Sequence, residues 1–550
     1  MFKNKIFLAI SLSLLCTSSL KAQNSDFEDG KNIELFFNVY NSVVLNYVDT
    51  VNTEKAIKTA IKAMFSELDP YTEYYDAEDS KEFLISVSGK YGGLGSIIRR
   101  HYNDSTATQI AEVYKDAPAD KAGLKAGDKI LFIDGINLKN KPLDEVSNLM
   151  KGDPGTTLEM VVAPVRDTTL RDTLTIRRQQ ISLDAVDYYE LLEGGIGYIS
   201  LITFSENCSE EVRNAINSLK SQGMTSLIID LRSNGGGLLT EATKLVSFFV
   251  PKGSKVVDVK GRAGYIKDES YVTQHSPILP DIPLVVMVNK SSASASEIVA
   301  GAIQDLDRGV VIGQRTFGKG LVQSTVGVGY DSSIKVTTAK YYIPSGRCIQ
   351  ALDYSHRDKD GSVGVVPDSL KSEFETLKGR KVYDGGGILP DSVYEPSIAS
   401  RFYSYMCITG YLDDFVYDYY SKNKEIPDVD TFKLSDEDWA KFKKSLESKD
   451  LKYSYESDDS LDKFIKKAKA EGHYDEILPY IEQIKAKIVV DNDELLEENK
   501  ELLESYMSNM IVRMYHYAKG SIRHLIRDDK GVTIATSILS DMQVYNNILE

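Results

Sequence analysis

The chain has 550 residues, which is more than a single hydrophobic core supports and therefore predicts several domains. Its composition is that of an ordinary globular protein, with 42% hydrophobic and 27% charged residues. The formal net charge of -16 argues against nucleic acid as a partner, because a phosphate backbone is bound by an excess of Lys and Arg.

The N-terminus has the layout of a secretory signal peptide. Lys3 and Lys5 precede the apolar run IFLAISLSLL, which is shorter than the roughly 20 residues that span a bilayer, and small and polar residues then lead to Ala22. We expect cleavage after Ala22, export to the periplasm or cell envelope, and no transmembrane segment in the mature chain. Cys16 suggests a lipid anchor, but Leu15 before it is bulkier than such cleavage sites prefer, so we expect none.

The next two regions differ in pattern. Residues 23–85 place apolar side chains at helical spacing and predict a small helical region. Residues 86–178 are short β runs separated by Gly and Pro turns. They contain a GGLG turn at 92–95, followed about thirty residues later by AGLKAGDKILFIDG.

These two motifs resemble a PDZ domain of the circularly permuted bacterial kind. The resemblance implies that Gly92, Gly93, Leu94 and Gly95 form the loop that binds a free peptide C-terminus. Successive backbone N–H groups of such a loop hold the carboxylate while the peptide adds to the sheet as a strand. A Gly-rich hairpin without a ligand is the alternative.

Residues 179–395 alternate strand and helix patterns. Strands are expected at 195–204, 225–231 and 283–289, followed in turn by the helical segments SEEVRNAINSLKSQG, LLTEATKLVSFFV and EIVAGAIQDL. Such alternation predicts a parallel α/β sheet with functional loops at the carboxyl ends of its strands. Residues 321–344 are rich in Val, Thr and Tyr around a Gly-Tyr-Asp turn and predict a β-hairpin.

Residues 396–550 are charge-rich and helical. Leu503, Tyr506, Met510 and Met514 form a stripe at helical spacing, which is typical of core packing. The amphipathic helices fit a homodimer surface, an adaptor-docking platform or a substrate-enclosing vault, and the sequence does not choose among them.

The segment GQRTFGKG at 313–320 nearly matches a phosphate-binding loop. Gly320, however, stands where that loop needs a Ser or Thr hydroxyl for magnesium, and a β pattern follows where the loop would open a helix. We therefore expect Lys319 to bind no nucleotide phosphate.

Ser294, in SSASASEI, precedes a predicted helix, and with Glu297 it forms a capping-box pattern that by itself needs no further function. Asp305 follows eleven residues later and Lys319 twenty-five residues later. In this combination the chain, over roughly residues 30–395, resembles the C-terminal processing peptidases, or tail-specific proteases, which are PDZ-containing serine peptidases with a Ser/Lys dyad.

The resemblance implies an α/β multidomain protein whose protease core has a crotonase-like fold with an inserted PDZ domain and flanking helical regions. It also assigns roles to single residues. Ser294 would be the nucleophile, Lys319 the base and Gln323 the residue that orients the lysine, with Asp305 in a supporting role. No cofactor or metal is implied, because no His, Cys or acidic cluster has ligand spacing.

The implied oxyanion donors are the backbone N–H groups of Gly236 and Ala295. The family's usual loop has a proline where this chain has Gly235, which should loosen the loop without removing the N–H of Gly236. A serine hydroxyl needs an adjacent base, and a lysine amine can act as one only when burial favours its neutral form.

Other serine chemistries lack their motifs. Ser292 and Ser296 are nearby alternatives for the nucleophile, but neither has the spacing to Lys319 that Ser294 has. There is no G-x-S-x-G elbow, and a trypsin-like site is excluded because only His101 and His275 precede Ser294, with no Gly-Asp-Ser-Gly setting. The pairs Ser421/Lys424 and Ser460/Lys463 mimic a penicillin-binding pattern in charged helical sequence without its partner motifs.

We therefore expect an exported serine endopeptidase whose PDZ domain binds apolar free C-terminal tails of unfolded or precursor proteins. The alternative is a catalytically silent PDZ scaffold. Five parts are expected: signal peptide 1–22, helical region 23–85, PDZ domain 86–178, peptidase core 179–395 and helical domain 396–550. Cys208, Cys348 and Cys407 are too widely spaced for a disulfide framework or a zinc site.

Overall fold

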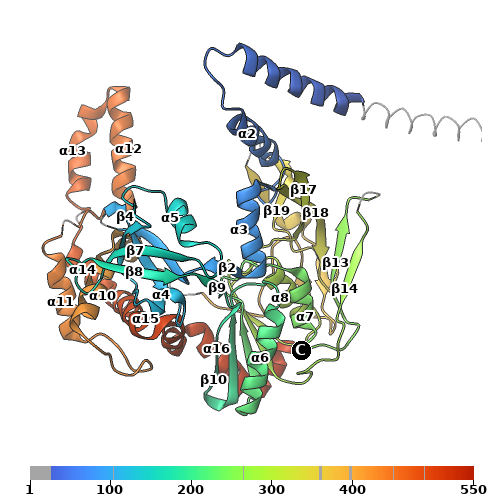
Figure 1. The fold of residues 1–550 in the computed structure, drawn as a ribbon. Coiled ribbons are helices and arrows are strands. Elements are labelled where there is room, and N and C mark those ends of the chain that lie inside the picture. Colours follow the sequence, from blue (N-terminus) through green and yellow to red (C-terminus); the bar gives the residue numbers. More distant parts are fainter. Residues whose placement is uncertain are drawn as a thin grey trace, which may run out of the picture. The chain divides into compact units, whose positions relative to one another are not determined.

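The computed structural model describes residues 27–102, 104–263, 266–357, 362–395, 399–449, 451–488 and 490–550 (Figure 1). The predicted signal peptide and Cys16 lie outside the described residues. The chain divides into two compact units. One comprises residues 1–77 and 323–337, and the other comprises residues 78–322 and 338–550.

The first unit contains the helices expected near the N-terminus and a strand that was not expected. Its elements are a helix over 27–46, α2 (Thr53–Ser66), β1 (Glu73–Tyr75), and most of β17 (Leu321–Gly329) with the first part of β18 (Ser332–Tyr342). β1 pairs antiparallel with β18, and Lys335 Nζ lies 2.9 Å from Glu73 Oε2 across the pair. A strand of three residues is too short for an alternating pattern to reveal it.

The second unit begins with an antiparallel β region that spans the predicted PDZ domain. Its strands run in the order β3-β4-β5-β7-β8, with β6 beside β5, around a core that includes Leu94, Ile110 and Val146. The elements are α3 (Ala77–Ser88), β3 (Ser96–His101), β4 (Asp104–Val113), α4 (Pro118–Lys121), β5 (Lys129–Ile133), β6 (Ile136–Asn137), α5 (Leu143–Met150), β7 (Thr157–Ala163) and β8 (Asp172–Arg177).

A short antiparallel pair joins the two ends of this β region. It consists of β2 (Lys90–Gly93) and β9 (Gln179–Ser182), with Gly92 opposite Gln180. Because the chain enters and leaves side by side, the PDZ region interrupts the surrounding structure as an insertion would.

The central sheet of the second unit has the expected parallel α/β organisation. Its order is β10-β11-β12-β15-β16-β23, and every neighbouring pair is parallel except β10 with β11. The strands are β10 (Val186–Leu192), β11 (Ile196–Leu201), β12 (Ser226–Asp230), β15 (Leu284–Val288), β16 (Val310–Gly313) and β23 (Ser392–Val393).

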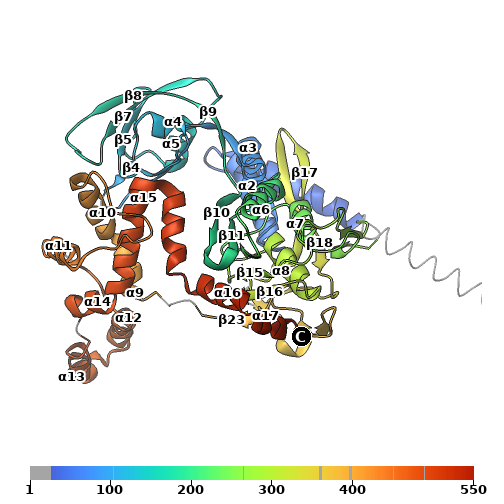
Figure 2. The same cartoon turned by 90° about the horizontal axis from the view of Figure 1, so that it is seen from below.

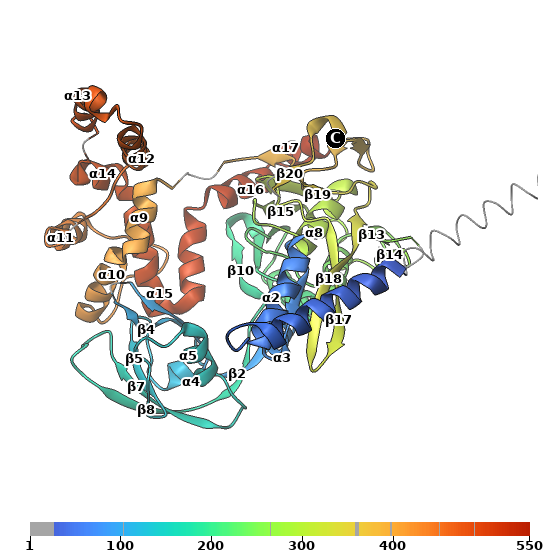
Figure 3. The same ribbon diagram turned by 90° about the horizontal axis from the view of Figure 1, so that it is seen from above.

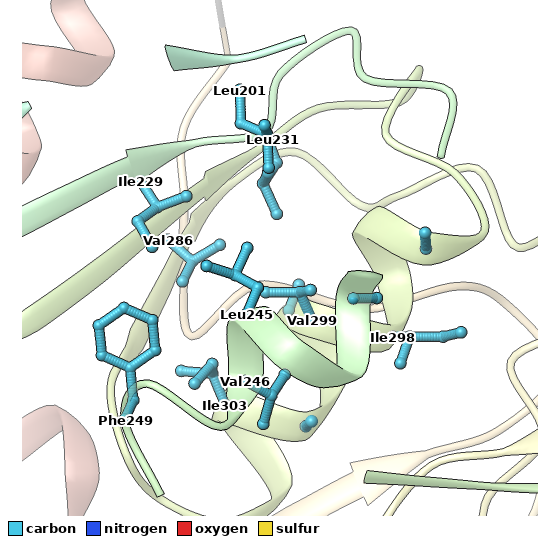
Figure 4. Packing of buried hydrophobic residues seen from close by; sticks show 14 of the residues in the cluster. Leu201, Ile229, Leu231, Leu245, Val246, Phe249, Val286, Ile298, Val299 and Ile303 are labelled. Atoms are coloured by element: carbon cyan, nitrogen blue, oxygen red, sulfur yellow. The ribbon is translucent and has the colours of Figure 1, made fainter. Parts of the chain in front are cut away.

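Helices cover both faces of this sheet. The covering helices are α6 (Cys208–Ser221), α7 (Leu239–Val246) and α8 (Ala295–Asp305) on one face, and α16 (Lys530–Ser540) and α17 (Met542–Leu549) on the other. Figure 4 shows Leu245 of α7 and Val299 of α8 beside Val286 of β15, in the same apolar cluster as Ile229 of β12. Ile228, the preceding residue of β12, contributes to the other cluster, where α16 and α17 lie beside the sheet (Figure 2).

Smaller β elements surround the sheet, and the predicted hairpin of β17 and β18 is present. Gly261 of β13 lies opposite Ala339 of β18. The remaining elements are β13 (Lys255–Gly261), β14 (Glu269–Val272), β19 (Leu352–Arg357), β20 (Val363–Val365), β21 (Glu373–Glu375), β22 (Lys381–Tyr383), and the short turns η1 (Glu193–Gly195) and η2 (Asp368–Leu370).

The C-terminal helices form a core of their own and contact the PDZ region (Figure 3). Tyr517 Oη donates to Asp120 at 2.7 Å, and Arg99 donates to Tyr417 Oη at 2.7 Å. The predicted stripe is confirmed as core packing, since Leu503 is fully buried in the helical cluster. The helices are α9 (Arg401–Thr409), α10 (Tyr411–Lys422), α11 (Asp436–Leu446), α12 (Glu456–Glu471), α13 (Tyr474–Lys485), α14 (Asn492–Glu498) and α15 (Lys500–Arg527).

Burial on both faces of β12 leads to a prediction for two adjacent residues. Ile228→Ala and Ile229→Ala should each destabilise the fold by about 2–5 kcal/mol, because each removes apolar contacts from a different face of the sheet. Calorimetric unfolding should show a lower transition temperature for both. Ile202→Ala is the matched control. Because Ile202 is 47% exposed, this variant should lose far less stability. An unchanged transition temperature in Ile228→Ala or Ile229→Ala would contradict burial on the corresponding face of the sheet.

Candidate active site

Two loops leave adjacent parallel strands at the edge where an α/β site is expected. Ile228 of β12 lies opposite Val285 of β15, so the loops at 231–238 and 289–294 begin side by side. The side-chain oxygen of Asn289 accepts the backbone N–H of Ser233 at 2.9 Å and of Ser291 at 3.0 Å. Asn289 therefore holds the two loops together.

Three serines around the junction of the second loop and α8 differ in their surroundings. Ser292 Oγ donates to the carbonyl oxygen of Leu231 at 2.7 Å, and Ser296 Oγ donates to that of Asn234 at 2.8 Å, and both side chains are fully buried. Ser294 between them is partly exposed. Its φ of 56° and ψ of -114° lie in a region that side-chain-bearing residues avoid, which is typical of functional turns.

Gly236 lies against the backbone of Ser294 and Ala295. A Cβ added to Gly236 would lie only 2.8 Å from Ser294 Cβ and 3.0 Å from Ala295 N, and its φ of 101° also favours glycine. Ala295 is the first residue of α8, where an N–H has no acceptor inside the helix and the helix dipole is positive. The structure thus brings the two predicted oxyanion residues together with Ser294.

A buried carboxylate joins the serine loop to the lysine segment. Glu297 Oε2 accepts the backbone N–H groups of Ser294 and Lys319, each at 2.9 Å. Its Oε1 accepts Thr316 Oγ1 at 2.6 Å and the N–H of Gly318 at 2.7 Å. Both N–H groups bind the same oxygen, Oε2, at 2.9 Å. The backbone nitrogens of Ser294 and Lys319 therefore lie no farther apart than these two hydrogen bonds placed end to end.

Tyr341 forms a second bridge between the same residues. Its hydroxyl contacts the carbonyl oxygen of Ser294 at 3.3 Å and also the carbonyl oxygen of Lys319. Tyr341 lies on β18 and is almost completely buried. The structure therefore fixes Ser294 and Lys319 to each other through two side chains from different elements.

These two bridging roles were not predicted from the sequence. Glu297 was expected only as the partner in a capping box, and the cap is indeed present, since Glu297 accepts the N–H of Ser294. The available signal was an acidic residue followed directly by a run of small and apolar residues, Ile298 to Ile303, because such a helix is buried and its charge needs several partners. For Tyr341 the sequence carried no signal.

Burial controls the electrostatics of Glu297. Removal from water raises the pKa of this carboxyl to about 7, while its hydrogen bonds to Thr316, Lys319, Gly318 and Ser294 oppose the rise. The carboxyl therefore changes its charge near neutral pH.

Asp305 lies at the opposite end of α8 from Ser294. Its Oδ1 binds Arg347 Nη2 at 2.7 Å, its Oδ2 accepts the N–H of Ser345 at 2.9 Å, and the ion pair is buried. Burial raises the pKa of Asp305, and Arg347 opposes that rise. Asp305 thus anchors the end of α8 to the segment after β18.

Gln323 belongs to the first unit. It lies on β17, and its side-chain amide donates to Thr337 Oγ1 on β18 at 3.1 Å. The expected role of orienting Lys319 stays a prediction.

The GGLG segment differs from the predicted turn in its first half. Gly92 and Gly93 are residues of strand β2, because β9 supplies a pairing partner for them. Leu94 is buried in the PDZ core, and Gly95, with a φ of 74°, leads into β3. A Cβ at Gly92 would lie 2.1 Å from the carbonyl oxygen of Gly152, so glycine is needed there for close approach of the backbone.

The described residues offer neither a metal site nor a membrane-spanning helix, and their cysteines are unpaired. They contain no group of three or more His, Cys, Asp or Glu side chains that could hold a metal. No helix among them is long and apolar enough to cross a membrane. Cys208, Cys348 and Cys407 are all free thiols.

The raised pKa of Glu297 predicts how stability depends on pH. The unfolded chain releases this proton near pH 4.3 and the folded chain near pH 7, so the stabilisation by protonated Glu297 is complete below about pH 4 and is lost as the pH rises through about 7. Glu297→Gln removes this titration. The melting temperature of the wild type minus that of Glu297→Gln should therefore fall between pH 5 and pH 7.5. A constant difference would show that Glu297 does not titrate in this range.

Asp305→Asn should destabilise the fold by about 3–5 kcal/mol, because it leaves the Arg347 guanidinium buried without a counter-charge. Denaturant titration measures the loss, and the double variant Asp305→Asn/Arg347→Met should recover much of it. Asp418→Asn is the matched control, since the Asp418–Lys422 pair is exposed and contributes less than about 1 kcal/mol. Equal losses of stability in Asp305→Asn and Asp418→Asn would contradict the role of Asp305 as an anchor for α8.

Family models match three parts of the chain. The model for peptidase family S41 matches residues 195–368, a PDZ domain model matches 109–164, and the model for the C-terminal helical domain of probable PDZ-proteases matches 402–539. Two solved structures are also similar. One is a photosystem II D1 C-terminal processing protease, which is 27% identical, with 65% of this chain and 86% of that chain covered and a TM-score of 0.35. The other is the peptide-bound PDZ domain of a carboxy-terminal protease from Vibrio cholerae, which is 24% identical, with 17% of this chain and 99% of that chain covered and a TM-score of 0.16.

Relatives match over most of their length. A carboxy-terminal-processing protease of Bartonella bacilliformis is 34% identical over 371 residues, which cover 66% of this chain and 80% of the relative. A probable CtpA-like serine protease of Staphylococcus epidermidis is 32% identical over 373 residues, covering 66% and 74%. The chain therefore belongs to the carboxy-terminal-processing proteases of peptidase family S41, serine-type peptidases, and it carries a PDZ domain and a C-terminal helical domain.

Proposed function

We propose that this protease is exported, captures apolar free C-terminal tails of unfolded or precursor proteins through its PDZ domain, and cleaves them with a Ser294/Lys319 dyad. The observation that carries the proposal is the shared anchoring of these two residues. Glu297 binds both backbone N–H groups, and Tyr341 contacts both carbonyl oxygens.

The choice of Ser294 over its neighbours rests on burial. Ser292 and Ser296 are fully buried, and each hydroxyl donates to a backbone carbonyl. Ser294 is partly exposed at the start of α8. Of Ser292, Ser294 and Ser296, it is therefore the one that a substrate can reach.

We also propose the five-part division of the chain given above and a crotonase-like fold for its core. The pairing of β2 with β9 supports an inserted PDZ domain, since it closes the region between them. Layers of helices on both faces of a mainly parallel sheet support the core assignment.

In the first chemical step, neutral Lys319 takes the proton from Ser294 Oγ as the oxygen attacks the carbonyl carbon of the scissile bond. The N–H groups of Gly236 and Ala295 stabilise the negative charge on the carbonyl oxygen, and each such donor contributes about 3–4 kcal/mol to the transition state. Lys319 then returns a proton to the leaving amine, and an acyl-enzyme remains on Ser294.

Water completes the reaction. Lys319 accepts a proton from water as the water attacks the acyl carbon, and the same donors stabilise the second tetrahedral intermediate. Its collapse returns the proton to Ser294 Oγ and releases the new C-terminus. Gln323 would hold the lysine in place during both steps.

The neutral lysine requires shielding from water. Gly318 and Gly320 support this, because both permit close approach of a neighbouring segment to the backbone on either side of Lys319. A Cβ at Gly318 would lie 2.4 Å from Ala351 Cβ, and one at Gly320 would lie 2.8 Å from Gln350 N.

Recognition of the tail would use the edge of the PDZ sheet. β3 is the end strand of that sheet in the described chain, so an extended peptide can pair with it as an added strand. Leu94 and Gly95 precede β3 directly, which is where N–H groups can bind the terminal carboxylate. Ile97 on β3 is 44% exposed and offers an apolar contact.

The test uses the mature protein and an unfolded reporter that ends in an apolar free tail, with cleavage followed by mass spectrometry. The wild type should cleave, and Ser294→Ala should lower kcat by at least roughly a thousandfold. Ser291→Ala is the matched control, because Ser291 is an exposed neighbour in the same loop and should retain activity. Amidation of the reporter's C-terminus should raise KM by roughly tenfold with little change in kcat, because it removes the carboxylate.

Two results would contradict the proposal. Equal cleavage by wild type and Ser294→Ala would rule out Ser294 as the nucleophile. Binding of the reporter without cleavage by the wild type would favour the scaffold alternative.

A further inference from the structure

Asn234 is a fully buried polar residue that the reaction scheme does not use. It lies in the loop after β12, two residues before Gly236. Its side-chain oxygen accepts the N–H of Gly236 at 2.9 Å, and its side-chain nitrogen donates to the carbonyl oxygen of Leu201 at 2.7 Å. Its own carbonyl oxygen accepts Ser296 Oγ at 2.8 Å.

The first of these bonds involves a group that catalysis needs. An N–H carries one hydrogen, and a well-aligned bond to one acceptor leaves it poorly directed toward a second. The N–H of Gly236 is directed at Asn234 Oδ1 in this structure, so it is not available to a substrate carbonyl oxygen.

We propose that Asn234 is a positioning residue that caps the oxyanion donor of the resting enzyme, and that catalysis requires the Gly235–Gly236 peptide to rotate and release its N–H. This inference rests on the proposed function, because it concerns the oxyanion donor assigned there. It implies two states of one loop, a capped resting state and an uncapped active state.

The bonding pattern identifies the group that moves. Asn234 is held by Leu201 through its side chain and by Ala293 and Ser296 through its carbonyl oxygen, so its amide stays in place. The carbonyl oxygen of Gly236 is likewise held by the N–H of Phe204 at 3.0 Å. The peptide between residues 235 and 236 is the segment free to turn.

Glycine on both sides of this peptide permits the rotation. Rotation changes ψ of Gly235 and φ of Gly236 in opposite senses and leaves the rest of the chain in place. Gly236 has a φ of 101° and, as a glycine, adopts negative φ equally well. A Cβ at Gly235 would have no atom within 4 Å, so the side of Gly235 on which a side chain would stand is open.

The capped state also explains how substrate could trigger the change. A scissile carbonyl that enters the site competes with Asn234 Oδ1 for the same N–H, and the developing oxyanion is a stronger acceptor than a neutral amide. The N–H of Gly236 would therefore pass from Asn234 Oδ1 to the substrate oxygen, and favour the active state, only when a substrate is engaged at Ser294.

The decisive experiment compares crystal structures of the wild type with and without a peptide boronic acid. Ser294 Oγ adds to boron and loses its proton to Lys319, and a boron-bound oxygen takes the place of the oxyanion. We expect Gly236 N to lie about 3 Å from that oxygen and away from Asn234 Oδ1, with the bond from Asn234 to Leu201 unchanged. An adduct on Ser294 in which Gly236 N still donates to Asn234 Oδ1 would overturn the inference.

A kinetic experiment tests the cap in solution. Asn234→Asp replaces the amide by a carboxyl group and removes the donor to Leu201. At a pH high enough to ionise this buried carboxyl, its bond to the N–H of Gly236 is roughly twice as strong, so kcat should fall by about tenfold or more with KM unchanged. The loss should shrink as the pH is lowered and the new carboxyl is protonated. Asn140→Asp, in the PDZ region, is the control for added charge and should retain wild-type kcat. A folded Asn234→Asp protein with wild-type kcat, or with a loss independent of pH, would contradict the cap.

The outcomes separate this inference from the proposed function. Failure of the wild type to form a boronate adduct on Ser294, or cleavage that survives Ser294→Ala, would reject the proposed function itself. Adduct formation and Ser294-dependent cleavage without movement of Gly236 would reject only the cap.

Discussion

The arrangement of the active site depends on one buried carboxylate. Glu297 accepts four donors, two from each side of its carboxyl group, and they belong to the serine loop and to residues 316–319. Neither segment has regular secondary structure to fix it. Their relative position is set by this group, by the Tyr341 hydroxyl and by one backbone hydrogen bond, from the N–H of Phe317 to the carbonyl oxygen of Ser292 at 3.0 Å. Burying a carboxylate is unfavourable unless such donors surround it, which means that the loops and Glu297 stabilise one another.

The loop that carries Gly236 is also tied to the C-terminal helices. Arg232 binds Asp230 at the end of β12 and Asp529 at the start of α16, with closest distances of 2.6 and 2.8 Å. Asp529 in turn accepts the N–H of Val532 and caps α16. α15, which directly precedes this cap, contacts the PDZ region through Tyr517. The chain from α15, which is kinked at Tyr517, to the start of α16 thus contacts both the PDZ region and the segment that leads to Gly236.

Much of this could be predicted from the sequence where local pattern and tertiary environment agree. The buried strands of the central sheet followed from apolar runs that alternate with helical patterns, and the hairpin of β17 and β18 followed from its composition around a turn. The family was inferred from a resemblance carried by the PDZ motifs and by the motifs around Ser294 and Lys319. The bridging roles of Glu297 and Tyr341 could not be predicted, because they depend on contacts between segments distant in sequence. The strand character of Gly92 and Gly93 was missed for the same reason, since their partner β9 lies almost ninety residues away in the chain. Asn234 carried no signal either, because an asparagine before glycines is typical of any turn.

The position of α16 and α17 has a consequence for synthesis of the enzyme. These helices cover one face of the catalytic sheet, yet in the chain they follow the whole helical region from α9 to α15. Until they have been translated, Ile196, Ile228, Met287 and Ile312 have no covering layer, so an unfinished chain exposes a broad apolar surface. The sheet that positions the serine and glycine loops can therefore reach its final packing only after α17 has been made. In this way the order of synthesis itself delays assembly of the candidate active site.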